Sequence, residues 1–256
     1  MRSLLVTLPM LLAACGSAGE PAAEASGAAV ATAPVAASSP TAAPAKPARH
    51  ELSACPKLVR DDENGLLERK APLAVPKALA ELVAADMNQF AVTTLGGGTG
   101  CIDVRWMEAI GTPTLSKDQR FLSFGWNGYE AFGFIVFDRA GKGASFETGD
   151  TPVWSASRQH FAAIDLSESG FGGLNAFGVW EVTAGATQEL SAQSDGLPSG
   201  DWRVDGWQGD SCVAISLVPS ERMPSDAGRL ARAARDPWYA AAAKGWKLQP
   251  GSCPKA

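Results

Sequence analysis

Stretches in which apolar and polar residues alternate fill the middle of the chain. From about Phe90 to Val218, short runs rich in β-branched and aromatic residues are separated by Gly, Asp, Asn and Pro. A period of two residues bounded by turn formers is typical of half-buried β-strands. The clearest runs are "RFLSFGW", "FGFIVFD", "HFAAIDL" and "FGVWEVT". The middle of the chain is therefore predicted to be a β domain.

Helical spacing marks both flanks of this region. Val75–Met87 brings Leu79 onto one face with two further aliphatic residues, and a proline at the start suits the first turn of a helix. Ser225–Trp246 is rich in Ala, begins with a residue that can cap, and is interrupted at Pro237. These patterns predict α-helices on either side of the β domain.

The β region contains an internal repeat, because Thr112–Lys142 can be aligned with Thr151–Val182. The copies start about 39 residues apart and end about 45 apart, a spacing that suits one small antiparallel unit, so the second copy carries about 5 extra residues. The matched pairs are Thr112 and Pro113 with Thr151 and Pro152, Ser116 with Ser155, Phe121 with Phe161, and "AFGF" at Ala131 with "AFGV" at Ala176.

Both copies resemble the WD40-like repeat of TolB-type β-propellers. The resemblance lies in "LSKDQRFLSFGW" with "FGFIVFDRAGK", and in "VWSASRQHFAAID" with "FGVWEVTAGA". It implies antiparallel blades of turn, strand, loop and strand, although the Pro-Asp-Gly turn of the family is "KDQ" in one copy and "ASR" in the other. The region has space for about three units, whereas propellers usually close with four or more. The expected fold is mainly β, with blade-like antiparallel repeats in a partial propeller, a twisted sheet or a sandwich, and flanking α-helices.

The start of the chain predicts an exported protein. Arg2 precedes an apolar run that is too short to span a bilayer and that leads into small residues and Cys15. The tetrapeptide "LAAC" resembles the lipobox of bacterial lipoproteins, which implies that residues 1–14 are a removed signal peptide and that Cys15 is lipidated. Gly16 in place of Asp implies the outer membrane of a Gram-negative cell, with the domain facing the periplasm. An ordinary signal peptide is the alternative.

A linker is predicted to follow the anchor. Residues 15–50 consist largely of Ala, Pro, Ser, Gly and Thr, which cannot bury enough apolar surface to offset the entropy of ordering. A flexible chain of this length has an end-to-end distance of roughly 30 Å. Residues 51–256 remain, which is the size of a single domain.

Charge and cysteine content narrow the function classes. The formal net charge of −5 argues against a nucleic-acid partner, because such a partner requires a positively charged surface. An even number of cysteines in an exported domain predicts disulfides. They could be two local disulfides, or one disulfide could join the two ends of the domain. With two histidines in the chain to supplement them, no metal and no other cofactor are expected. The four cysteines are Cys55, Cys101, Cys212 and Cys253.

No catalytic motif is apparent. "SESGFGG" and "GLPSGD" both miss the nucleophile elbow, and "GGGTGC" is predicted to be a turn because a strand, not a helix, follows it. His160 is the sole histidine inside the domain and lacks an accompanying nucleophile motif. Several carboxylates could meet in space as a glycosidase pair, but nothing singles out two of them. They are Glu130, Asp138, Asp165, Glu168 and Glu181.

Aromatic residues and one loop supply the candidate binding site. Trp154 and Trp180 occupy repeat positions and are predicted to be core, whereas Trp126 stands at the predicted tip "WNGYE". The second repeat is longer in the loop "SESGFGGLNA", and insertions on repeat scaffolds tend to gather on the binding face. The predicted partner-binding residues are Trp126, Tyr129, Glu168, Phe171 and Asn175.

The expected function is binding or scaffolding of a protein or glycan partner at the cell envelope. The alternatives are a hydrolase of envelope glycan or peptide, and a periplasmic inhibitor of a hydrolase.

Overall fold

The computed structural model describes residues 50–58, 71–128, 131–164, 177–193 and 196–255. The chain divides into two units, Met1–Ala43 and Pro44–Ala256, and every described residue belongs to the second. The predicted signal peptide and Cys15 lie outside the described residues, as does nearly all of the predicted linker. In the described part, no helix has the length and apolar character needed to cross a membrane.

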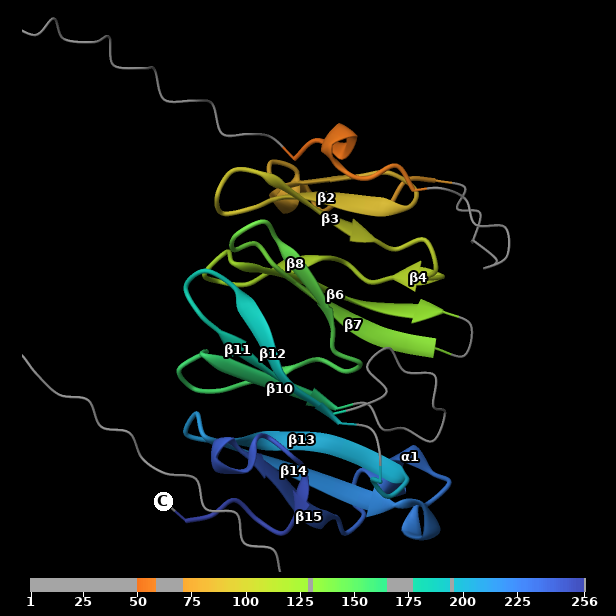
Figure 1. The fold of residues 1–256 in the computed structure, drawn as a ribbon. Coiled ribbons are helices and arrows are strands. Elements are labelled where there is room, and N and C mark those ends of the chain that lie inside the picture. Colours follow the sequence, from red (N-terminus) through yellow and green to blue (C-terminus); the bar gives the residue numbers. More distant parts are fainter. Residues whose placement is uncertain (1–49, 59–70, 129–130, 165–176, 194–195, 256) are drawn as a thin grey trace, which may run out of the picture. The chain divides into compact units, whose positions relative to one another are not determined.

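Four antiparallel sheets follow one another in chain order (Figure 1). The first contains β1 (Val83–Ala85), β2 (Gln89–Thr93) and β3 (Thr99–Asp103). The second contains β4 (Ala109–Ile110), β5 (Thr114–Leu115), β6 (Phe121–Gly128), β7 (Ala131–Asp138) and β8 (Ala144–Glu147). The third contains β9 (Val153–Trp154), β10 (His160–Ile164), β11 (Phe177–Val182) and β12 (Thr187–Gln193). The fourth contains β13 (Gly200–Gln208), β14 (Cys212–Pro219), β15 (Asp236–Ala241) and β16 (Gln249–Pro250).

Helical structure is limited to single turns in the described residues. The 3₁₀-helices are η1 (Leu52–Ala54), η3 (Lys77–Leu79), η4 (Ser220–Arg222) and η5 (Ala242–Lys244), and the one α-helix is α1 (Ala227–Leu230). The prediction of a mainly β fold with blade-like antiparallel repeats is thus confirmed.

The two predicted flanking helices are wrong. In Val75–Met87, the aliphatic spacing belongs to η3 and β1, because Leu82 accepts a backbone hydrogen bond from Thr93 of β2. In Ser225–Trp246, the helical part is limited to the single turns α1 and η5, and Asp236–Ala241 forms β15, in which Ala240 and Ala241 are buried beside β14. Burial in a ladder outweighs the helix preference of alanine here. Because these segments supply strands, the structure has four sheets where the sequence predicted space for three.

The turns of the two copies match as the sequence alignment predicted, but the strands align one residue away from that alignment. Ser116 Oγ accepts the N–H of Phe121, and Ser155 Oγ accepts the N–H of His160, at 2.9 and 3.2 Å. Gln119 and Arg158 both adopt a left-handed backbone, at φ 58° and 60°. The structural equivalent of Phe121 is therefore His160 rather than Phe161.

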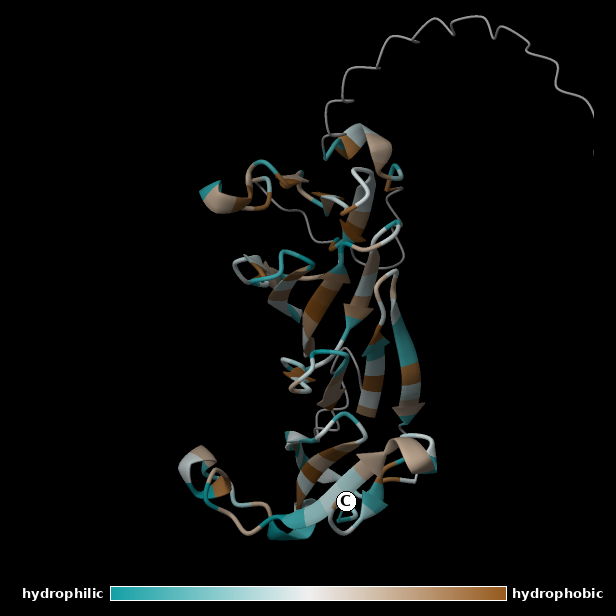
Figure 2. Cartoon of the chain, turned by 90° about the vertical axis from the view of Figure 1, so that its left-hand side faces the viewer, coloured by the Kyte–Doolittle hydropathy of each residue, from teal (hydrophilic) through white to brown (hydrophobic). Residues whose placement is uncertain are grey.

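Apolar residues recur along the strands, as the brown segments of Figure 2 show. Their side chains form clusters that join neighbouring sheets. Leu122, Phe124 and Trp126 on one face of β6 join Phe90 and other residues of the first sheet in one core cluster. On the opposite face, Phe121 lies 4.8 Å from Trp154 of the third sheet, measured between ring centroids. A further cluster joins the third and fourth sheets. The second and third sheets therefore each pack against a neighbour on both faces.

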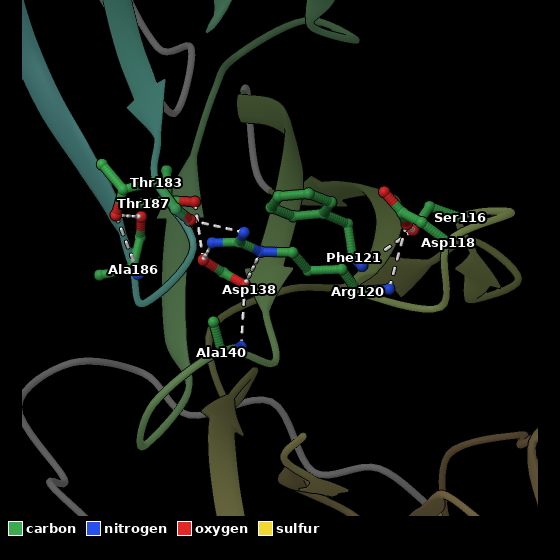
Figure 3. A network of polar contacts seen from close by, with 9 residues as sticks. All are labelled: Ser116, Asp118, Arg120, Phe121, Asp138, Ala140, Thr183, Ala186 and Thr187. Atoms are coloured by element: carbon green, nitrogen blue, oxygen red, sulfur yellow. Dashed lines mark hydrogen bonds and ion pairs between the residues drawn. The ribbon is translucent and has the colours of Figure 1, made fainter. Parts of the chain in front are cut away.

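A buried carboxylate ties the second sheet to the third (Figure 3). Asp138, at the end of β7, is 1% exposed and accepts hydrogen bonds from both Nε and Nη2 of Arg120, at 2.8 and 2.7 Å. Thr187 of β12 donates its hydroxyl to Asp138 at 2.7 Å, and Arg120 also donates to the carbonyl of Thr183 at 2.6 Å. Burial by itself would raise the pKa of Asp138, but the hydrogen bonds from Arg120, Ala140 and Thr187, with the charge of Arg120, lower it.

The next residue, Arg139, ties the second sheet to the first. It is 4% exposed and donates from Nε to the carbonyl of Thr93 at 2.6 Å and from Nη1 to that of Gln119. Its own carbonyl accepts the N–H of Leu95 at 2.7 Å. Asp138 and Arg139 are adjacent in the sequence, so one corner of the second sheet is bonded to both neighbouring sheets.

Two disulfides sit on the first and last sheets. Cys55 is bonded to Cys101 of β3, and Cys212 of β14 is bonded to Cys253. Of the two arrangements that the sequence left open, the structure has two local disulfides rather than one that joins the ends of the domain. Each bond fastens a terminal segment to the nearest sheet.

We expect both disulfides to contribute strongly to stability. Replacing the Cys55 and Cys101 pair, or the Cys212 and Cys253 pair, by serine should lower the free energy of unfolding by about 2–4 kcal/mol, because each bond closes a long loop in the unfolded chain. Urea unfolding measures this loss. Titration of the unfolded, unreduced chain should find no free thiol among the four cysteines; two or more free thiols there would contradict the assignment.

Removal of the Asp138 carboxylate should destabilise the fold in a pH-dependent way. Asp138→Ala leaves Arg120 partly buried without its partner, which should cost about 3–5 kcal/mol at neutral pH. Because the folded pKa of Asp138 is lowered, its contribution is complete above the unfolded pKa of about 3.9 and is lost as pH falls through the folded value.

Urea unfolding between pH 7 and pH 2 tests this dependence, with Asp103→Ala as the control, since Asp103 forms an exposed pair with Arg105. The control should lose less than about 1 kcal/mol. An acid decline that is equally steep with and without Asp138 would show that its ionisation does not stabilise the fold.

Candidate binding groove

Three hollows involve residues of the first three sheets, and neighbouring hollows share lining residues. The proline hollow, of about 620 Å³, is lined by Ala71–Pro76 together with Phe90 and Ile110. The glycine hollow, of about 390 Å³, shares Gly111 with it. The tryptophan hollow, of about 220 Å³, contains Trp154 and shares Phe134 and Thr151 with the glycine hollow. We refer to the three together as the groove.

The glycine hollow exists because β6 lacks a side chain at one position. Alternation along β6 places Ser123, Gly125 and Asn127 on the same face, and Gly125 lies opposite Phe134 of β7. A Cβ built on Gly125 would meet only the carbonyl of Gly133 and the ring of Phe134, both at 3.8 Å. The space beside these groups is therefore open. A glycine inside a strand often marks such a site.

The backbone next to this hollow is already paired. Gly111 donates its N–H to the carbonyl of Gly125 at 2.8 Å, and a Cβ at Gly111 would lie 3.1 Å from that oxygen. Ile110 and Trp126 are partners in the ladder between β4 and β6. A ligand in the glycine hollow would therefore meet side chains and ring faces rather than a free strand edge.

Exposed rings near this end of the second sheet are Trp106 and Phe132. They are 44% and 42% exposed, whereas Trp126 is 2% exposed. Trp126 covers Gly133 and lies 4.3 Å from Trp106 between ring centroids. Its Nε1 has no hydrogen-bond partner among the described residues. The structure thus places the accessible aromatic surface at Trp106 and Phe132 rather than at the indole of Trp126.

Charges differ between the hollows. In the tryptophan hollow, the guanidinium of Arg158 lies 4.3 Å from the centre of the Trp154 ring, and its Nε lies 3.9 Å from Asp118. Burial would raise the pKa of Asp118, but hydrogen bonds from Ser116 and the Arg120 N–H, with the charge of Arg158, lower it. In the glycine hollow, Asp150 is the one charged lining residue.

Four of the five predicted partner-binding residues lie outside the described residues. Tyr129 follows the end of β6, and the other three fall in the segment between β10 and β11. The structure neither joins them to the groove nor separates them from it. These residues are Tyr129, Glu168, Phe171 and Asn175.

Two of the residues considered for catalysis, His160 and Asp138, have structural contacts. His160 lies 5.8 Å from Trp207 and 5.6 Å from Trp246 between ring centroids, and its Nδ1 has no hydrogen-bond partner among the described residues. Ser155, which is 2% exposed, accepts the backbone N–H of His160. Asp138 is paired with Arg120. Ser155 and His160 therefore shape the turn before β10.

The glycine-rich stretch Gly96–Cys101 forms the turn between β2 and β3 and the start of β3, as the sequence predicted. Within the described ranges, no group of three or more His, Cys, Asp or Glu residues is placed to hold a metal ion.

Comparison with known proteins adds little to this picture. No protein-family model matches the chain, and no curated protein matches it. Among solved structures, similar folds include a putative 6-phosphogluconolactonase from Bacteroides fragilis, at 9% identity and a TM-score of 0.32 over 63% of this chain. A structure from a study of two prolyl endopeptidases matches at 14% identity and a TM-score of 0.32 over 66%.

The chain spans about half the length of the first of these proteins and about a quarter of the second, at 49% and 27%. Likeness at this level carries no argument about activity. The description of the sheets as blade-like accordingly rests on their own topology.

Sequence reasoning missed the groove residues that matter most. Gly125 takes the position between the apolar Phe124 and Trp126 in "FLSFGW", and a glycine inside a predicted strand is a signal that could have been found. Phe132 and Asp150 could not have been found in the same way, because β7 supplies one and the connection between β8 and β9 supplies the other.

We expect the two aromatic residues near this hollow to differ sharply in their effect on stability. Trp126→Ala empties a buried site and should lower the free energy of unfolding by about 3–5 kcal/mol. Phe132→Ala removes an exposed ring and should cost less than about 1 kcal/mol. Urea unfolding compares the two variants, and equal losses would mean that Phe132 is part of the core rather than of the groove surface.

Proposed function

We propose that this chain is a lipid-anchored protein of the cell envelope whose blade-like domain binds a protein or glycan partner in the groove. The anchor is Cys15 in the "LAAC" stretch, and the linker holds the domain away from the outer membrane on its periplasmic side. The lipobox resemblance and the composition of the linker support this cellular location.

The observation that carries the binding role is the groove itself. Its lining residues come from three consecutive sheets and combine aromatic residues with a few polar ones, which is the usual character of a ligand site. Phe132 offers an exposed ring there without being needed for the core. Its neighbour Gly125 leaves room for a partner group against the sheet.

Two other roles, an envelope hydrolase and an inhibitor of a hydrolase, lack a supporting observation of this kind. A hydrolase needs a nucleophile or acid near a base. In the described part of the chain, Ser155 is engaged with the backbone and Asp138 with Arg120. Binding is therefore the function that the described contacts favour.

The proposal is tested with the full-length chain in a Gram-negative host. Gly125→Val fills the hollow, and it should be tolerated because valine suits a strand and no contact closer than 3.8 Å is created at Cβ. A photo-crosslinking residue at position 132 should capture a partner in the wild type and lose it in Gly125→Val. Gly185→Val is the control, because Gly185 is exposed and nothing lies within 4 Å of its Cβ position.

The anchor is tested in the same cells. Labelled fatty acid should enter the wild type and not Cys15→Ala, which should leave the membrane fraction or stall before export. Label that persists in Cys15→Ala would contradict the anchor, and an unchanged crosslink in Gly125→Val would contradict the groove as the binding site.

A further inference from the structure

We propose that the glycine hollow binds a cationic group, an ammonium or a guanidinium, supplied by the ligand. This inference rests on the proposed function, since it names the chemistry that the groove recognises. The same chemistry can come from a basic residue of a partner protein or from a free amine.

The protein twice places a cation of its own between an aromatic ring and an aspartate. The guanidinium carbon of Arg120 lies 5.2 Å from the centre of the Phe121 ring, and its Nη2 lies 2.7 Å from Asp138. Arg158 lies 4.3 Å from the Trp154 ring centre and 3.9 Å from Asp118. The first combination is the contact between the second and third sheets, and the second lines the tryptophan hollow.

The glycine hollow has the same residue types in its lining without a cation. Its lining residues include Phe132, Phe134 and Asp150, and none of them is Lys, Arg or His. Asp150 accepts a hydrogen bond from the N–H of Thr151 at 2.6 Å and forms no ion pair within the described residues. An exposed ring and a carboxylate from residues that line one hollow are complementary to a positive charge.

The net charge of the chain also favours a cationic ligand. The chain carries a formal net charge of −5, which disfavours anionic ligands and favours encounter with cations. A volume of about 390 Å³ is ample for a trimethylammonium group with a short stem, or for the end of a lysine or arginine side chain. A neutral sugar could also contact the ring, but its binding would not depend on the charge of Asp150.

The experiment compares choline with its uncharged analogue 3,3-dimethylbutan-1-ol by ligand-observed NMR on the full-length chain. Choline should bind, and the analogue should bind at least about twofold to fivefold more weakly, which is the range that a cation over a partly exposed ring contributes. Asp150→Asn and Phe132→Leu should each weaken choline by a similar factor. Gly125→Val should abolish its binding.

Two controls separate the site from general electrostatics. Asp103→Asn removes one acidic charge from an exposed pair elsewhere, and Gly185→Val repeats the glycine substitution in an exposed turn. Both should leave choline binding unchanged. Equal weakening by Asp103→Asn and Asp150→Asn would mean that choline responds to net charge only and would overturn the site.

A short peptide containing two lysines distinguishes the sources of the cation. If it binds at least tenfold more tightly than choline, a basic partner protein supplies the group, whereas comparable affinities indicate a small amine. Three results would overturn the inference. They are equal binding of choline and its neutral analogue, no binding of choline, and displacement of choline by a neutral oligosaccharide but not by the cationic peptide. The crosslink from position 132 would then still decide the proposed function, because it does not depend on which ligand is charged.

Discussion

The structure depends on the bonds that Asp138 and Arg139 make at the end of β7. Asp138 accepts hydrogen bonds from Arg120 beside β6 and from Thr187 of the third sheet, while Arg139 donates to the backbone of the first sheet at Thr93. Both side chains are buried, so each must keep its partners if the fold is not to contain an unpaired charge. The second sheet is thereby fixed between its neighbours, and the groove, whose walls come from adjoining sheets, inherits that placement.

In the described part of the chain, the first and fourth sheets each have one face that no neighbouring sheet covers. In an array of stacked units, the outer face of each end unit has no neighbour to cover it, and end units usually carry a polar outer face. In the fourth sheet, Ser216 and the bonded Cys212 lie on the face opposite Ile215 and Leu217, which pack on the third sheet. The first sheet likewise carries Cys101 opposite its core residues. A disulfide-fastened terminal segment therefore lies at each end of the series.

The sequence predicted the inner part of this fold well, because β6, β7, β10 and β11 have a simple alternation and sit between two neighbours. It predicted the ends less well. The alanines of β15 and the leucines near β1 fit a helical pattern equally well, and only their ladder partners decide the outcome. The burial of Trp126 could have been read from its even spacing with Leu122 and Phe124. The glycine hollow could not, since Phe134 of β7 and Asp150 of the connection between β8 and β9 both line it only because of how the chain folds.

The central claim is that the carboxylate of Asp138 couples the second sheet to the third. A double-mutant cycle with Asp138→Asn and Thr187→Val measures this coupling most directly, because the Thr187 hydroxyl donates to Asp138 across the two sheets at 2.7 Å. We predict that the two losses in the free energy of unfolding are not additive and differ from their sum by about 0.5–3 kcal/mol. Additive losses would contradict the claim and would leave apolar packing and the bond from Arg120 to the Thr183 carbonyl as the links between the two sheets.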